Sequence, residues 1–131
     1  MDVSIRVNAQ TANDISAIAC SIECGGYKTH IQALLDGVTS VQAQMYAIIF
    51  AVYRLKYCCN VTIYTNLKFL ESQWEKIKEK GACPSLANFE LWEHLFFHRW
   101  SPFFKIVYRP EEVEKVREAA VNLLDKTLMQ K

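Results

Sequence analysis

The sequence predicts an α/β domain that begins as an antiparallel β-meander and continues as alternating helices and strands. Two observations predict this class. Apolar and polar residues alternate up to about residue 35, as in half-buried strands, whereas from residue 39 the apolar residues recur every three or four positions, as in helices. Strand-like segments at 60–65 and 102–108 interrupt the helical part. The expected order is βββ-α-β-α-α-β-α, in a single domain that spans residues 1–131.

The first three strands are expected to follow one another through short turns. Apolar residues alternate with polar ones in 3–7 and again in 14–24. Gly25–Gly26 is typical of a two-residue hairpin turn that leads into a third strand at 27–35. Strands joined in this way pair antiparallel.

The first helix has a clear start signal. Thr39 and Ser40 are good N-cap residues, and Gln42 stands three positions after Thr39, as in a capping box. An apolar stripe then continues to about Lys56, and Gln44 borders its buried face. The later elements are a strand at 60–65, a helix over 67–77, a helix that begins at Ser85, a strand at 102–108 and a final helix whose first turn begins at Pro110.

Composition and charge narrow the class of protein. The chain has 131 residues, 51% of them hydrophobic, and a formal net charge of +1, so no global charge favours nucleic acid. No apolar run is long enough to span a membrane and no signal-peptide pattern is present, so we expect an intracellular protein, cytoplasmic or nuclear, with no membrane association. The five cysteines lack CxxC spacing, so we expect free thiols and no metal site.

Four sequence segments in this order resemble the ribonuclease H family, in particular its cellular type I enzymes. They are "QAQMYAIIFAVYRL" (42–55), "VTIYTNLKFL" (61–70), "NFELWEHL" (88–95) and "FKIVYRPEEVEKVREAA" (104–120). The resemblance covers nearly the whole chain. It implies an RNase H-like fold, in which a five-stranded mixed sheet (three antiparallel strands, then parallel strands) is flanked by helices. It also implies a link to RNA/DNA hybrids, whose RNA strand these enzymes cleave with two Mg²⁺ ions held by carboxylates.

The family's four metal-binding acids are all absent from the positions that match them. The resemblance places Asn8, Gln44, Asn66 and Arg117 there, although a shift of one residue would bring Glu118 to the last position. Mg²⁺ requires anionic oxygen ligands, and an amide oxygen carries no net charge. No catalytic residue is therefore retained, and we expect no metal and no cofactor, in contrast to the Mg²⁺ of the active family.

Two functions follow from this pattern. The first is a catalytically inactive RNase H-like domain, a pseudoenzyme that binds either an RNA/DNA hybrid or structured RNA, or a protein partner; the near-neutral charge favours a protein partner or self-association. A viral origin fits this hypothesis. The alternative is a metal-dependent ribonuclease H whose acids were neutralised by deliberate substitution or lie elsewhere in the chain. The nearby candidates are Asp2, Asp14, Asp36 and Glu118, none of which stands at a strand end in the right register.

Other residues allow a purely structural interpretation beside a functional one. Ser40 and Lys68 match positions that touch substrate in the family, so they are the expected nucleic-acid contacts. The lysines of 76–80 alternate with glutamates, which favours a solvated helix end over a phosphate clamp. Trp74 and Trp92 fall in apolar stripes, which favours core packing over stacking on bases.

Overall fold

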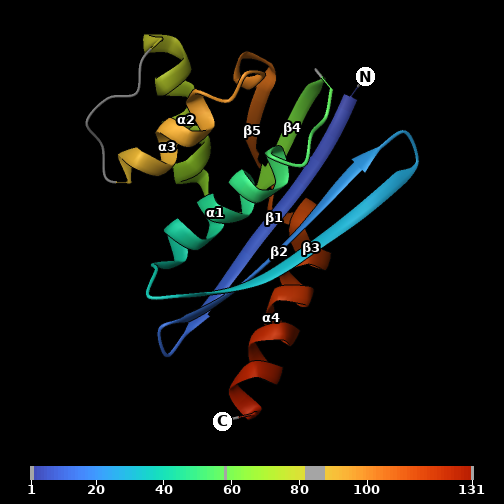
Figure 1. Cartoon of the computed structure of the whole chain (residues 1–131), viewed down its shortest axis with the longest axis vertical. Helices are drawn as coiled ribbons and strands as arrows, with labels where there is room; N and C mark the ends of the chain where they lie inside the picture. The colour runs from blue at the N-terminus through green and yellow to red at the C-terminus, as the bar shows by residue number, and fades with distance from the viewer. Residues whose placement is uncertain (1, 58, 82–87, 131) are drawn as a thin grey trace.

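A five-stranded mixed sheet with helices on both faces forms the centre of the molecule (Figure 1). The structure is a computed structural model and describes residues 2–57, 59–81 and 88–130. The strand order is β3-β2-β1-β4-β5; β1 to β3 pair antiparallel, and β4 and β5 pair parallel to β1. The predicted five-stranded mixed sheet is therefore confirmed. The strands are β1 (Asp2–Ala12), β2 (Ile15–Cys24), β3 (Tyr27–Asp36), β4 (Asn60–Thr65) and β5 (Phe104–Tyr108).

Two-residue turns join the three antiparallel strands. Gly25 and Gly26 have φ values of 56° and 90°, so the predicted hairpin turn is confirmed. Asn13 and Asp14 make the equivalent turn between β1 and β2, with φ values of 52° and 63°. Asn and Asp are the non-glycine residues that most readily adopt this left-handed conformation, which a tight hairpin requires at both central positions.

Helix α1 (Ser40–Val52) begins as predicted and ends earlier. In the capping box, the Thr39 Oγ1 accepts from the Gln42 N–H at 3.1 Å and the Gln42 Oε1 accepts from the Thr39 N–H at 2.9 Å. The prediction that the helix continues to about Lys56 is wrong. The last turn tightens, with the Leu55 N–H bonded to the Val52 carbonyl, and Leu55 still packs against the core. The apolar periodicity therefore outlasts the helix.

The other helices are α2 (Lys68–Lys80), α3 (Phe89–Phe96) and α4 (Glu114–Met129). The predicted helix start at Ser85 lies outside the described residues. The strand predicted at 102–108 begins only at Phe104, because Pro102, which has no N–H for a ladder, lies in a short 3₁₀ turn, η1 (Ser101–Phe103). Pro110 likewise opens a 3₁₀ turn, η2 (Pro110–Val113), rather than the first turn of an α-helix.

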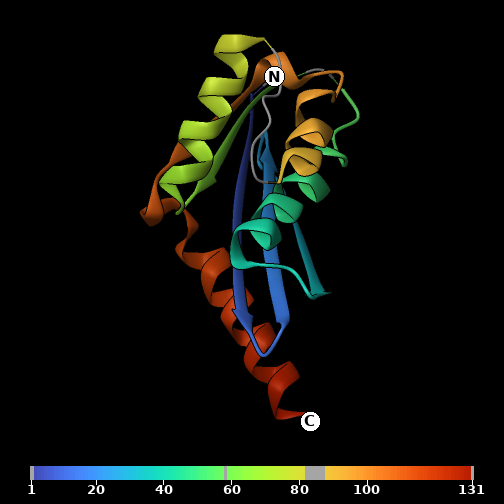
Figure 2. The ribbon, with the colours of Figure 1, turned by 90° about the vertical axis from the view of Figure 1, so that its left-hand side faces the viewer.

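Helices α1, α2 and α3 cover one face of the sheet and α4 covers the other (Figures 1 and 2). On the first face, Trp74 and Trp92 are each 1% exposed and stack with ring centroids 6.3 Å apart, so their predicted core role is confirmed. On the second face, α4 packs through Val116 and Ala120 against Ala19 of β2. Among the described residues, no helix is long and apolar enough to cross a membrane.

Candidate functional site

Two amide side chains, those of Gln44 and Asn66, meet where β4 ends against α1, and a third, Asn8, lies on the neighbouring strand β1 with its side chain on the α4 face. Asn8 lies in β1, Gln44 in α1, and Asn66 directly follows the last residue of β4. β1 and β4 run parallel and their last paired residues are Arg6 and Tyr64, so Asn8 and Asn66 each follow that pair by two positions. We call Asn8, Gln44 and Asn66 the amide cluster.

Gln44 is held by hydrogen bonds at both ends of its amide. Its Nε2 donates to the Oδ1 of Asn66 at 3.2 Å, and its Oε1 accepts from the Oγ1 of Thr65. The Thr65 hydroxyl in turn accepts from the Leu67 N–H at 3.1 Å, at the start of the chain segment that enters α2. Gln44 is 2% exposed and Thr65 is fully buried. These neutral bonds join α1 to the end of β4 without any charged group.

Asn8 is fully buried. Its neighbours Val7 and Ala9 belong to the core between the sheet and α1, so strand alternation places the Asn8 side chain on the opposite, α4 face. Its Oδ1 accepts from the Nε2 of Gln10 at 2.8 Å. Its Nδ2 is buried and has no hydrogen-bond partner within the described part of the chain. The buried amide N–H of Asn8 can donate to a hydrogen-bond acceptor, and its partial positive charge would repel a cation.

The donor set of the amide cluster does not fit Mg²⁺. A hard dication needs carboxylate or phosphate oxygens, and the three side chains are uncharged. The Gln44 Oε1 and the Asn8 Oδ1 already accept hydrogen bonds, and the buried Nδ2 of Asn8 would repel a cation. Across residues 2–57, 59–81 and 88–130, no three or more His, Cys, Asp or Glu side chains lie together in a way that could hold a metal ion.

Arg117, the fourth predicted position, lies on α4 beside the helix face that packs on the sheet. Lys115 and Ala119 line a hollow towards β2 and β3, so Arg117, on the other flank of α4, lies on the side of β1 and β4. Its side chain is exposed. Among the residues that the structure describes, no hydrogen bond joins Arg117 to Asn8, Gln44 or Asn66. Glu118, one position on, is also exposed and turns further from the packed face of α4.

The two predicted nucleic-acid contacts lie next to the amide cluster. Ser40 is one helical turn before Gln44 on the same side of α1, and Lys68 opens α2 two residues after Asn66. Both side chains are exposed. The structure thus brings Ser40 and Lys68 to the rim of the cluster.

Sequence reasoning missed two residues that hold the cluster in place, Thr65 and Gln10. Thr65 immediately precedes Asn66 and alternates with it across the sheet, so its hydroxyl faces α1. Gln10 is two residues after Asn8 and therefore on the same strand face. Strand alternation was the signal that could have found both.

No protein-family profile matches the chain. No curated protein sequence matches it either. Solved structures do match over almost the full length. The LC11-RNase H1 isolated from compost by a metagenomic approach superposes with a TM-score of 0.79 at 16% identity, over 97% of this chain and 98% of that chain.

The same enzyme in complex with an RNA/DNA hybrid gives a TM-score of 0.74 at 18% identity, over 96% of this chain and 99% of the other. RNase H1 from the archaeon Halobacterium salinarum NRC-1 gives 0.70 at 12% identity, with coverage of 96% and 99%. The chain has the ribonuclease H fold. At these identities the likeness concerns the fold, and the chemistry has to be argued from the chain's own residues.

Proposed function

We propose that the chain is a non-catalytic RNase H-like domain that acts by binding. The observation that carries this proposal is the neutral, hydrogen-bonded amide cluster at the end of β4. A two-metal site needs several carboxylates to neutralise two dications, and Asn8, Gln44 and Asn66 contribute no charge. With Arg117 on the adjacent flank of α4, the only formal charge among the four positions is positive.

Nucleic acid is one candidate ligand of this domain. One solved structure of the same fold is a complex of LC11-RNase H1 with an RNA/DNA hybrid. In this chain, Ser40 and Lys68 are exposed at the rim of the amide cluster, where they can contact a backbone phosphate. Two such contacts and a net charge of +1 support only weak, salt-sensitive binding.

Self-association is the form of protein binding that the sheet supports best. At one edge of the sheet, side chains of α2 form hydrogen bonds with backbone groups of β5. The Trp74 Nε1 and the Lys78 Nζ donate to the Phe104 carbonyl at 3.1 and 2.9 Å, and the Tyr108 N–H donates to the Glu71 carboxylate at 2.7 Å. At the other edge, β3 pairs with β2 and with no other strand among the described residues. A ten-residue edge strand without proline presents a row of peptide groups to another strand.

The pattern of charges on β3 favours a second copy of this chain as the partner. The tight turn makes Cys24 and Tyr27 a hydrogen-bonded pair, so the peptide groups of the even-numbered residues point outwards. An antiparallel pairing of two copies centred on Gln32 would then place Lys28 opposite the Asp36 of the second copy, twice by symmetry. All three side chains are exposed.

The non-catalytic proposal is tested with a labelled RNA/DNA hybrid in Mg²⁺ or Mn²⁺. The unmodified chain is compared with a variant that carries four acids, Asn8→Asp, Gln44→Glu, Asn66→Asp and Arg117→Asp. We expect cleavage by the variant alone, because the substitutions restore the charge that holds the metal ions. A titration of the hybrid at increasing salt, on the unmodified chain, measures binding separately. Affinity no stronger than millimolar at low salt would remove nucleic acid from the proposal.

The alternative is a ribonuclease H whose acids either were neutralised by deliberate substitution or lie elsewhere in the chain. The amide side chains fit the first form of this alternative, since Asn and Gln match Asp and Glu in volume. The same assay tests the second form of this alternative: cleavage by the unmodified chain would establish an enzyme whose acids lie elsewhere and refute the non-catalytic domain. A deliberately neutralised enzyme gives the same result as the non-catalytic domain, which is cleavage by the four-acid variant alone.

A further inference from the structure

The C-terminal end of α1 and the chain that follows α3 together form a second candidate binding surface. The ring of His98 joins the two segments. Its Nε2 donates to the Val52 carbonyl at 3.2 Å, and its Nδ1 accepts from the Trp100 N–H at 3.2 Å. Burial lowers the pKa of His98, so the ring is neutral when it makes these two bonds. The geometry of the surface is thereby fixed by the fold.

A groove of about 470 Å³ lies on this surface, and its lining is unusually uniform in chemistry. In the part of the chain that the structure describes, its lining consists of four aromatic rings, two cations and one aliphatic side chain, with no carboxylate. We call it the aromatic groove; its residues are Tyr53, Leu55, Lys56, Phe97, His98, Arg99 and Trp100.

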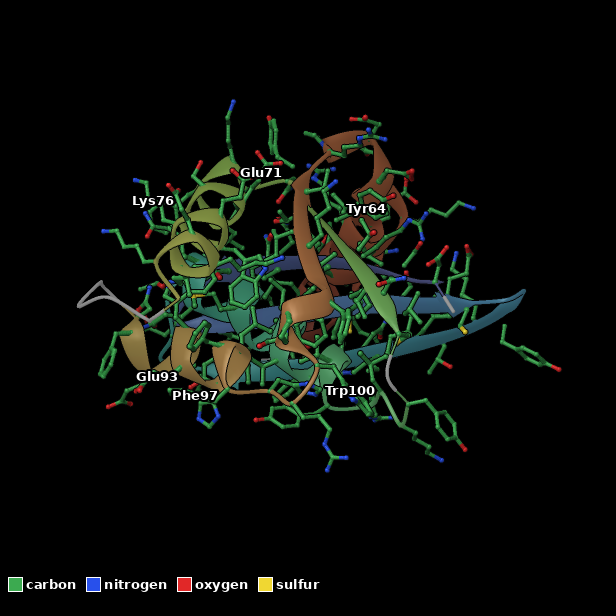
Figure 3. All side chains as sticks on the ribbon, turned by 90° about the horizontal axis from the view of Figure 1, so that it is seen from above. Tyr64, Glu71, Lys76, Glu93, Phe97 and Trp100 are labelled. Carbon is green, nitrogen blue, oxygen red and sulfur yellow. The ribbon has the colours of Figure 1, made fainter. Side chains whose placement is uncertain are left out.

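Two rings of the aromatic groove, Tyr53 and Phe97, are exposed, whereas His98 and Trp100 are half-buried. Tyr53 is 57% exposed and Phe97 is 70% exposed. The His98 ring lies 5.5 Å from that of Tyr53 and 5.6 Å from that of Trp100, so these rings form a continuous row. Figure 3 shows Phe97 and Trp100 along the same side of the molecule. Large exposed rings in one groove indicate a ligand surface.

The two cations stand beside the rings. The guanidinium of Arg99 lies over the ring of Trp100, 5.4 Å from its centroid, and Lys56 lines the same groove. A neighbouring hollow that shares Tyr53 and Phe97 carries Glu90 and Glu93. An anionic ligand is therefore directed towards the Lys56–Arg99 side and away from that hollow.

We propose that the aromatic groove binds single-stranded nucleic acid, with bases stacked on the exposed rings and phosphates beside Lys56 and Arg99. Every base offers a planar face to an aromatic ring, and each linkage carries one negative charge. A protein partner would require aliphatic surface as well, and of the described residues that line the groove Leu55 alone is aliphatic. Tyr53 follows Gln44 by nine residues, about 13 Å along a helix, so this site is separate from the amide cluster.

Tryptophan fluorescence gives a local measurement of binding at this groove. Trp74 and Trp92 are buried, whereas Trp100 is part of the groove, so quenching by a stacked base reports on Trp100. The probe is a labelled oligothymidylate, titrated without divalent metal so that cleavage cannot interfere. We expect quenching, with micromolar affinity at low salt. The slope of log K against log salt should be about −1.4, because two phosphates are neutralised on a single strand.

Variants place the binding at the groove. Phe97→Ala should weaken binding by about 5- to 150-fold, the usual effect of losing one stacked base. Lys56→Glu should weaken it and flatten the salt dependence. Tyr27→Ala and Lys126→Glu replace exposed residues on β3 and near the end of α4 and serve as matched controls that should leave the affinity unchanged.

Three results would overturn the proposal. They are the absence of binding at millimolar oligonucleotide, binding that Phe97→Ala and Lys56→Glu leave intact, and equal binding of an acidic polyglutamate peptide through the same residues. Since hybrid cleavage is measured separately and with metal, the outcome at the aromatic groove is independent of whether the amide cluster is catalytic.

Discussion

Replacing Gln44 by Glu is the most informative single change to the amide cluster. Gln44 is 2% exposed and its Nε2 donates to Asn66 at 3.2 Å. A carboxylate would place an anionic oxygen against the Asn66 Oδ1 and lose that hydrogen bond, worth about 1 kcal/mol. Burial would also raise the pKa of the new carboxyl group, and a rise of about 2 units corresponds to about 2.7 kcal/mol. We expect Gln44→Glu to lower the free energy of unfolding by about 2–4 kcal/mol at pH 8.

The pH dependence distinguishes charge from packing. The pKa of the new carboxyl group is higher in the folded chain than in the unfolded one, where it is about 4.3. The loss in free energy of unfolding is therefore absent below about pH 4.3. It grows as the pH rises to the folded-state pKa and is constant above it. At low pH the protonated group can donate to Asn66 as the amide does. Urea unfolding at pH 4 and pH 8 measures both values, with the exposed Gln130→Glu as control. An equal loss at both pH values, or none, would refute the buried hydrogen-bonded role of Gln44.

Other parts of the structure give three further predictions. Lys28→Glu and Asp36→Lys should each weaken self-association, measured by sedimentation equilibrium, and the double variant should restore it because the charge pair is re-formed in reverse. Unchanged association in all three variants would exclude the β3 pairing. Thr39→Ala should lower the free energy of unfolding, measured by urea denaturation, by about 1 kcal/mol because the N-cap of α1 is lost. A change below about 0.3 kcal/mol, the size expected when Gly replaces an N-cap residue, would argue against the capping box. Burial raises the pKa of Cys20 from 9.0 to about 12. Alkylation of Cys20 at pH 8 should therefore be about a thousandfold slower in the folded chain than in urea, because the thiolate is the reactive form. Comparable rates would show that the core around β2 opens readily.

The sequence predicted the elements whose patterns are local. Strand alternation, the Gly25–Gly26 turn and the capping box at Thr39 each depend on neighbouring residues, and each is confirmed. Errors arose where tertiary structure ends an element before its pattern ends. Leu55 keeps the apolar period of α1 after the helix has stopped, and Pro102 belongs to a 3₁₀ turn inside a segment that reads as a strand.

The sequence could suggest the positions of the candidate site, but not the way in which its residues are bonded. The resemblance to ribonuclease H placed Asn8, Gln44 and Asn66 at one site; in the structure Gln44 bonds to Asn66, and Asn8 bonds to Gln10 on the α4 face. The roles of Thr65 and Gln10 depend on which side chains meet across different elements. The aromatic groove could not be predicted at all, because Tyr53 and Phe97 are 44 positions apart and meet only through the packing of α1 against α3.

Hydrolysis of a labelled RNA/DNA hybrid by the unmodified chain, with Mg²⁺ or Mn²⁺, tests the central claim most directly. The neutral amide cluster predicts no cleavage above the rate without protein, at any concentration of either metal. Metal-dependent cleavage of the RNA strand that is lost on Asn66→Ala would contradict the account, because it would show that the amide cluster supports the reaction without its carboxylates.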